Sequence, residues 1–284
     1  MLRSMRLITK VGPLLLKAGL CALLAAMCGP GAATARHLSA GQSNEQPTPM
    51  QREIERQRQR LKSEDIEERR GALMRLGSLK RSDASRVAAT GLTDVAPIVR
   101  VTAAHAILSL PPAEAATLLI PLLQEKLEFV RREAAYALGE TRSRSAVAPL
   151  LNILVSDKDT GVRAAAAVAL GEIGDEAAVQ PLSQLLAGQT QNKKKAKAGE
   201  NEFVMRAAAR SLGQIKSRAG TGVLIATLAN DSLPIDVRRE AATALGMIGD
   251  TSAGPALQAA STSNDPYLSE AARAALHRLK ANRN

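Results

Sequence analysis

The chain has 284 residues, of which 45% are hydrophobic, but it holds only two Phe, two Tyr and no Trp. A composition so poor in aromatic residues suits closely packed helices rich in Ala, Leu and Val, and it argues against aromatic platforms that stack sugars or nucleic-acid bases. The formal net charge is +11, yet the excess lies in the first 62 residues and in one lysine run, so the rest of the chain is balanced.

The first 35 residues have the pattern of a secretory signal peptide. Arg3 and Lys10 belong to a basic start, residues 18–27 are apolar throughout, and Ala33-Thr34-Ala35 places small residues before a cleavage site. The apolar stretch is too short for a bilayer span, which needs about 20 residues. We therefore expect export, to a bacterial periplasm or out of the cell, with cleavage after Ala35. An uncleaved membrane anchor is the alternative.

Residues 36–48 follow as a polar linker. They are mostly Gly, Ser, Gln, Asn and Pro with no apolar period, so the segment buries too little surface to order itself and is predicted to be disordered. Both cysteines, Cys21 and Cys28, precede it. Removal of residues 1–35 therefore leaves no disulfide, Cys nucleophile or Cys metal ligand.

The first helix is expected over residues 51–61. Thr48-Pro49-Met50-Gln51 matches a capping box, in which the Thr and Gln side chains satisfy free amides at the start of a helix. Only Ile54 and Leu61 are apolar along this stretch. That pattern suits a terminal helix with one face against water.

From this point on, the sequence repeats itself. Clear copies of the motif Val-Arg-x-x-Ala-Ala-x-Ala-Leu-Gly begin at Val130, Val162 and Val237, and weaker copies raise the number to seven. A period of this kind predicts stacked units that bury their cores against their neighbours. The second motif position, which sets the register at intervals of 31, 31, 32, 42, 33 and 31, is filled by Arg69, Arg100, Arg131, Arg163, Met205, Arg238 and Ser269.

Each repeat is predicted to hold two helices. Within the motif, apolar residues recur at spacings of three and four, as on one face of a helix, and the Gly after Leu is expected to end that second helix. A first apolar helix precedes each motif, for example over 145–155 and 177–187. The repeats fill residues 49–282, and the long interval before Met205 predicts a basic loop insertion at 188–202.

The motif, extended by Glu172-Ile173-Gly174-Asp175, resembles the HEAT-like repeats grouped with phycobilisome lyase subunits, over about residues 50–280. The resemblance implies an all-α fold, a right-handed α-solenoid of about seven two-helix HEAT repeats. It also implies a structural ladder in which an acidic residue of each turn bonds an Arg six positions later. The matching pairs are Asp94 with Arg100, Glu125 with Arg131 and Asp157 with Arg163, while Asp231 lies one place off for Arg238 and Met205 interrupts the series.

Enzyme classes fit the chain poorly. Deoxyhypusine hydroxylases on this scaffold use His-Glu pairs, and none of the three histidines here is followed by Glu. No Gly-rich phosphate loop, Gly-x-Ser-x-Gly elbow or zinc-type His/Cys spacing occurs, so no catalytic residue, metal site or cofactor is expected. A lyase-like or other HEAT-family enzyme accessory subunit and a nucleic-acid-binding HEAT protein are the alternatives, and the scattered charge argues against the second.

The preferred interpretation is an exported, non-enzymatic scaffold that binds another protein through a concave face formed by the second helices. The free position inside Ala-Ala-x-Ala-Leu and the position one turn before it should face away from the core. We expect this face to be mildly basic, with aromatic and Arg side chains that often carry interface energy. The candidate binding residues are His105, Arg132, Tyr136, Arg206, Arg210, Arg239 and Thr243.

Two features of the expected surface carry separate predictions. The run Lys193, Lys194, Lys195 and Lys197 forms the basic loop, which is either a solvated spacer or a contact for a partner with an acidic surface. His105 is interpreted as an exposed polar residue, because the sequence offers it no partner ligands for a metal. Neither a small-molecule substrate nor a nucleic-acid partner is expected.

Overall fold

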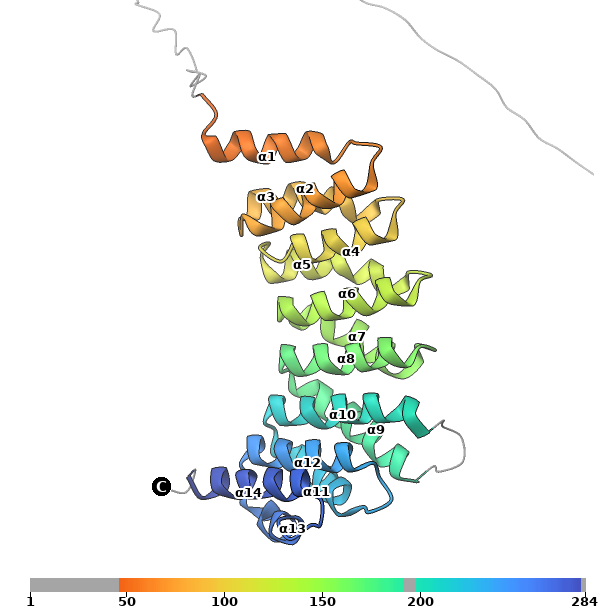
Figure 1. Ribbon diagram of the computed structural model, residues 1–284, viewed down its shortest axis with the longest axis vertical. Coiled ribbons are helices and arrows are strands. Elements are labelled where there is room, and N and C mark those ends of the chain that lie inside the picture. The colour runs from red at the N-terminus through yellow and green to blue at the C-terminus, as the bar shows by residue number, and fades with distance from the viewer. Residues whose placement is uncertain (1–45, 192–197, 282–284) are drawn as a thin grey trace, which may run out of the picture. The chain divides into compact units, whose positions relative to one another are not determined.

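Residues 46–191 and 198–281 are described by a computed structural model of the chain, and within them lie fourteen α-helices and no strand (Figure 1). The signal segment predicted at 1–35, most of the linker and the four loop lysines fall outside the described residues. In chain order, α1 to α14 are Pro49–Arg60, Ile66–Ser78, Ser82–Ala88, Pro97–Ala106, Pro112–Leu119, Glu128–Thr141, Val147–Ser156, Thr160–Ile173, Val179–Gln191, Ala198–Ile215, Thr221–Ala229, Ile235–Ile248, Gly254–Ala260 and Pro266–Ala281.

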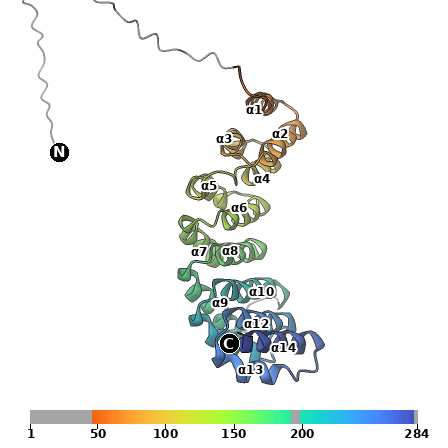
Figure 2. The same ribbon diagram turned by 90° about the vertical axis from the view of Figure 1, so that its left-hand side faces the viewer.

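The helices stack as seven antiparallel pairs. In each pair an odd-numbered first helix precedes an even-numbered second helix, and short 3-10 segments extend or introduce most of the first helices. Figure 2 shows the first and second helices as two layers, with the second helices on the inner side of a gentle bend. The predicted all-α solenoid of about seven two-helix repeats is confirmed.

The capping box predicted at the start of the stack is also confirmed. The Gln51 amide donates to Thr48 Oγ1 at 3.2 Å, and the Thr48 amide donates to Gln51 Oε1 at 2.7 Å. The helix that follows presents mostly polar residues, with Ile54 and Gln57 as its buried positions. It therefore covers the apolar end of the stack with a surface that tolerates water.

The core lies between the two layers and is built from the motif. Leu138 and Leu170 are fully buried, and the Ala residues around them let neighbouring second helices approach closely. Small side chains at the contacts explain how a chain with so few aromatic residues can fill its interior. The core is one continuous cluster that runs from Ile54 to Leu279.

The glycine that closes the motif does not end the second helix, contrary to prediction. Gly139 and Gly246 lie inside α6 and α12. A Cβ added at Gly139 would lie 2.7 Å from the Cα atom of Ala169, and one at Gly246 would lie 2.8 Å from Cα of Ala275. The motif therefore requires glycine because the backbone of the next second helix occupies the space of a side chain.

Helices α6, α8, α10 and α12 end two residues after this glycine, and the next residue has left-handed backbone. Gly174 and Gly249 have φ values of 72° and 76° and cap α8 and α12. Arg142 and Lys216 adopt the same region at the ends of α6 and α10, with φ values of 52° and 59°. A left-handed residue is a common helix terminator, and a cation at this end also interacts favourably with the helix dipole.

Both ends of the predicted loop insertion at 188–202 are helical. Helix α9 continues through Gly188 to Gln191, and α10 begins at Ala198, so most of the predicted loop at 188–202 is helical. Once a helix is formed, each further residue adds a hydrogen bond at small entropic cost, and this stretch contains no proline to stop it.

The packing glycines give a first stability prediction. We expect Gly246→Ala to lower the free energy of unfolding by about 1–3 kcal/mol, because the new methyl group overpacks the contact with Ala275. Gly222 in α11 is the matched control: no atom lies within 4 Å of its added Cβ, so Gly222→Ala should instead stabilise the protein by about 0.4–1 kcal/mol. Urea denaturation of both variants measures the difference, and equal effects would contradict the packing role.

Candidate protein-binding face

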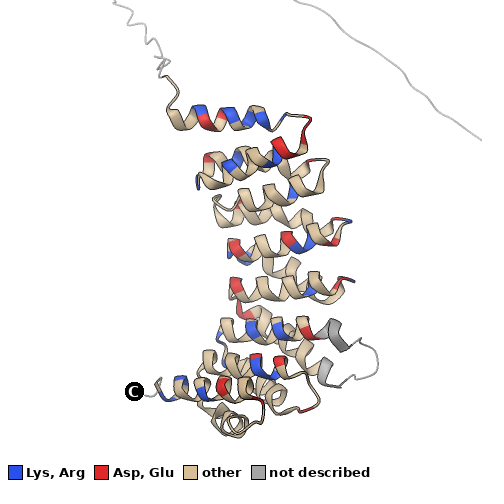
Figure 3. Cartoon of the chain, in the orientation of Figure 1, with Lys and Arg blue, Asp and Glu red and all other residues tan. Residues whose placement is uncertain are grey.

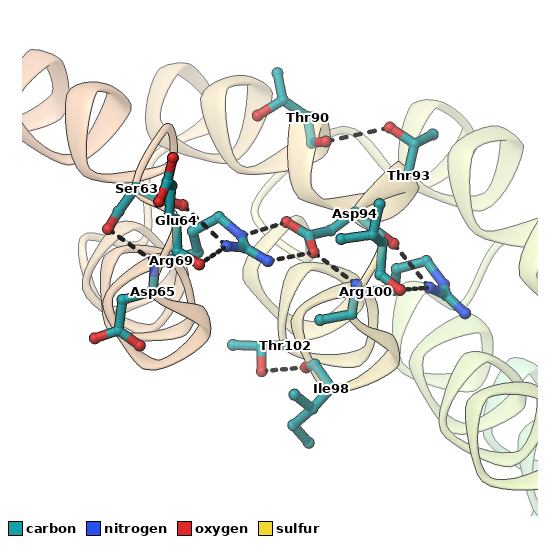
Figure 4. A network of polar contacts seen from close by, with 12 residues as sticks. Ser63, Glu64, Asp65, Arg69, Thr90, Thr93, Asp94, Ile98, Arg100 and Thr102 are labelled. Carbon is teal, nitrogen blue, oxygen red and sulfur yellow. Dashed lines mark hydrogen bonds and ion pairs between the residues drawn. The ribbon is translucent and has the colours of Figure 1, made fainter.

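An arginine near the start of the second helix links one repeat to the next. Arg69 of α2 donates from Nε and Nη2 to the carboxylate of Asp94 at 2.7 and 2.9 Å (Figure 4). Its Nη1 donates to the carbonyl oxygens of Ser63 and Glu64 in its own turn, at 2.9 and 3.0 Å. One guanidinium therefore ties two successive turns together.

The same arrangement recurs along the stack. The prediction was wrong about the carboxylates, which do not pair with the Arg six positions later. Arg100 donates to the main-chain carbonyl of Asp94 at 2.7 Å, whereas its ion pair is with Glu125 of the following repeat, also at 2.7 Å. Arg131 likewise pairs with Asp157, at 2.7 Å. A spacing of six residues brings the guanidinium of each Arg to the main-chain carbonyl oxygen of the acidic residue, and not to its carboxylate. The Asp94 carboxylate accepts from the Ala96 amide at 2.8 Å and turns toward the preceding repeat.

The ladder changes at the fifth repeat. Met205 is buried and offers no donor, as predicted. Before it, Arg163 donates to the carbonyl oxygen of Asp157 at 2.8 Å. After it, Arg238 pairs at 2.7 Å with Asp231 of its own turn, whose side chain is 87% exposed. These charges hold turns in place, which is the structural role expected from their recurrence.

The ladder also depresses carboxyl pKa values. The hydrogen bonds from Arg69 lower the pKa of Asp94 despite its partial burial. At Asp157, burial alone would raise the pKa, but the hydrogen bonds from Arg131 and from the Asp159 amide outweigh it and hold the pKa below its ordinary value. Both carboxylates are therefore held in their charged form by their neighbours.

This pKa shift predicts a pH-dependent contribution to stability. A carboxyl whose pKa is lowered by folding stabilises the protein above its unfolded pKa of about 3.9, and that stabilisation is lost as the pH falls through the folded value. We expect Asp157→Asn to destabilise the protein at neutral pH and to cost progressively less as the pH is lowered below about 3.9. Urea denaturation over a series of pH values measures this, and a cost independent of pH would contradict the electrostatic role.

The predicted binding residues lie at the surface of the second helices. His105 and Arg210 are exposed, and the other five are half-buried. They stand on α4, α6, α10 and α12, one or five residues after the register position. We define the second-helix face as the surface formed by three positions of each second helix. These positions lie two residues before, one residue after and five residues after the register position. Its three positions follow the i, i+3, i+7 spacing of one helical stripe.

Acidic residues on and beside the second-helix face pair with its basic side chains, and Figure 3 shows Lys and Arg next to Asp and Glu along the second helices. Arg210 donates to both carboxylate oxygens of Glu240 at 3.0 and 3.1 Å, and Arg239 pairs with Asp236 at 2.9 Å. Arg206 lies 3.9 Å from the same Asp236. Similar neighbours face Arg132, which lies 3.4 Å from Glu133, and His105, which lies 3.6 Å from Glu133 and 3.8 Å from Glu140. These acids stand at positions adjacent to the ones considered in the sequence.

All four aromatic residues of the chain lie on the second-helix face, and three of them were missed. Phe129, Phe203 and Tyr267 each stand two residues before the register position of α6, α10 and α14, and Tyr136 stands two stripe positions further along α6, beyond Arg132. Phe203 and Tyr267 are 65% and 68% exposed. The guanidinium of Arg239 lies 5.9 Å from the Tyr267 ring centre. The sequence already contained a signal for these three residues, because each of them stands two residues before the register position of its repeat.

Comparison with known proteins agrees with this architecture. HEAT repeats match residues 54–136, 128–201 and 192–277. The chain belongs to the HEAT-repeat family. A search of the curated proteins found no match.

Three solved structures are similar to this HEAT-repeat chain, and one of them has a TM-score above 0.5. The YibA protein of Escherichia coli is 19% identical with a TM-score of 0.54, over 81% of this chain and 82% of that one. The complex of CpcE and CpcF of phycocyanin lyase from Nostoc sp. PCC7120 is 23% identical with a TM-score of 0.49, over 86% and 91%. Human deoxyhypusine hydroxylase in complex with glycerol is 20% identical with a TM-score of 0.36, over 81% and 96%. Similarity at this level concerns the fold alone.

Two further observations concern the described part of the HEAT-repeat chain. No three His, Cys, Asp or Glu side chains gather there as a metal site requires. None of its helices is both long and apolar enough to cross a membrane.

Proposed function

We propose that this HEAT-repeat chain is an exported, non-enzymatic scaffold that binds another protein through its second-helix face. The observation that carries the proposal is the placement of the aromatic residues. A chain with only four of them places all four on this face, and Phe203 and Tyr267 are mostly exposed.

Physical chemistry supports a protein as the ligand of this face. Aromatic and Arg side chains dominate the binding energy of protein interfaces, usually as a few central residues surrounded by polar ones. The stripe combines these types: Phe203, Arg206 and Arg210 follow one another on α10, and Arg239 contacts Tyr267 across α12 and α14. Because the arginines of the face already have acidic partners, the face favours a partner with mixed polarity over a polyanion.

Capture experiments with matched variants test the face. We expect the double variant Phe203→Ala, Tyr267→Ala to recover partner proteins at least about tenfold less efficiently than the wild type, because each side chain is of the kind that carries 2 kcal/mol or more. The control is Val95→Ala, Val155→Ala, which removes residues that are 90% and 72% exposed but lie off the face. Equal recovery by both double variants would overturn the proposal.

Export is tested separately. The intact mass of protein recovered from an extracytoplasmic fraction should correspond to a chain that starts at Arg36, because the basic start, short apolar stretch and small residues before it fit signal-peptide processing. A full-length cytoplasmic species as the main form would contradict export and leave the binding face unaffected.

A further inference from the structure

A groove of about 480 Å³ lies between α2 and α4, at the first two repeats of the second-helix face. Its apolar lining includes Met74, which is 60% exposed, Ile98, which is 38% exposed, and Val101. Its size is within the range of sites that enclose small ligands or a few side chains.

The groove has a local cause in the sequence. Helix α4 ends at Ala106. This is two residues before Leu108, which stands at the motif position that Gly139 fills in α6. The chain then turns toward Pro111 and Pro112, which disfavour helix in the residue before them. At the floor, a Cβ on Gly77 would lie 3.1 Å from the Cα atom of Ala106, so the two helices touch there and the groove opens beside that contact.

The charges at the groove are unequal. Among the residues that the structure describes, no carboxylate lines it, while Arg70, Lys80 and His105 do. Arg70 is paired with Glu67 at 3.2 Å, and His105 lies near Glu133 and Glu140. Lys80, just beyond the end of α2, forms no ion pair with the residues that the structure describes. An uncompensated cation beside an apolar surface favours a ligand that carries both an apolar group and an anion.

We propose that this groove binds a peptide segment of the protein partner in which an apolar side chain is adjacent to Asp or Glu. The apolar side chain packs against Met74, Ile98 and Val101, and the carboxylate pairs with Lys80. This inference rests on the proposed function, since it identifies the chemistry of the partner at one end of the same face.

Selection from a display library of short random peptides tests the groove. The bait is protein recovered after expression of the full chain, and Met74→Gln serves for counter-selection, since its exposed position tolerates a polar helix former. We expect enriched peptides to share an apolar residue next to Asp or Glu. Met74→Gln should weaken their binding roughly tenfold through lost apolar contact.

Two lysine variants test the charge. Lys80→Asn should weaken the enriched peptides by about threefold and flatten their salt dependence, as an exposed ion pair predicts. Lys216→Asn is the matched control, because Lys216 has the same left-handed backbone at the end of α10, with φ 59° against 52° for Lys80. Asparagine tolerates this conformation in both places.

The outcomes separate this inference from the proposed function. Enriched peptides without an acidic residue, no enrichment over Met74→Gln, or equal weakening by Lys80→Asn and Lys216→Asn would each overturn the groove proposal. If partner capture still depends on Phe203 and Tyr267 in those cases, the second-helix face remains the binding surface.

Discussion

Replacing Arg131 with alanine is expected to lower the free energy of unfolding by about 3–5 kcal/mol. The side chains of Arg131 and Asp157 are only 8% and 5% exposed, so the substitution leaves a buried carboxylate without its counter-charge. It also removes the donor to the carbonyl oxygens of Glu125 and Lys126, which lie 2.9 and 3.1 Å from Nη1. Guanidinium denaturation, monitored by helical circular dichroism, measures the loss.

Arg144 supplies the matched control for this prediction. It lies 3.3 Å from Asp175 in a turn between repeats, but its side chain is 87% exposed. Arg144→Ala should therefore cost no more than about 1 kcal/mol, as is usual for ion pairs in water. If the two alanine variants were equally stable, the ladder would be a surface feature with no part in holding the repeats together.

The repeat architecture could be predicted because its signals are local. The spacing of Ala and Leu within one motif defines a helix face, and the capping box at Thr48 lies within four consecutive residues. Seven copies at a nearly constant interval then leave a stack of neighbours as the natural arrangement. No contact between repeats had to be known to reach that architecture.

Features that depend on how one repeat sits on the next could not be predicted in this way. The Asp94 carboxylate binds Arg69, which is 25 residues away, and not Arg100, which is six residues away. The stacking of two turns determines which guanidinium the carboxylate faces. The motif glycine was taken for a helix end for the same reason. At Gly139 the constraint is the backbone of Ala169 in the next helix, which no pattern within one repeat reveals.

The charge of the binding face shows a similar limit. Glu240 follows Arg239 directly in the chain but binds Arg210 of the preceding repeat, at 3.0 Å. A count of charges at the chosen repeat positions includes the arginines but omits acidic residues at the neighbouring positions. The aromatic residues were accessible in principle, since Phe129, Phe203 and Tyr267 share one place relative to the motif.

Replacing Leu170 with alanine is expected to cost about 2–5 kcal/mol of unfolding free energy. Leu170 is fully buried in α8, which packs against α6, α7 and α10. Deleting its branched end loses the transfer energy of three carbon atoms and leaves a cavity that the neighbouring Ala residues are too small to fill. Urea denaturation with a linear extrapolation gives the difference from the wild type.

Tyr136 is the comparison that tests the assignment of faces. Its side chain stands on the second-helix face and is half-buried, so Tyr136→Ala should cost less than Leu170→Ala although it removes more atoms. A larger loss at Tyr136 would mean that the face is part of the core and cannot serve as a free binding surface. Hydrogen exchange adds a spatial readout: because each repeat contacts only its neighbours, the faster exchange caused by Leu170→Ala should spread outward from α7 and α8, and reach α1 and α14 last.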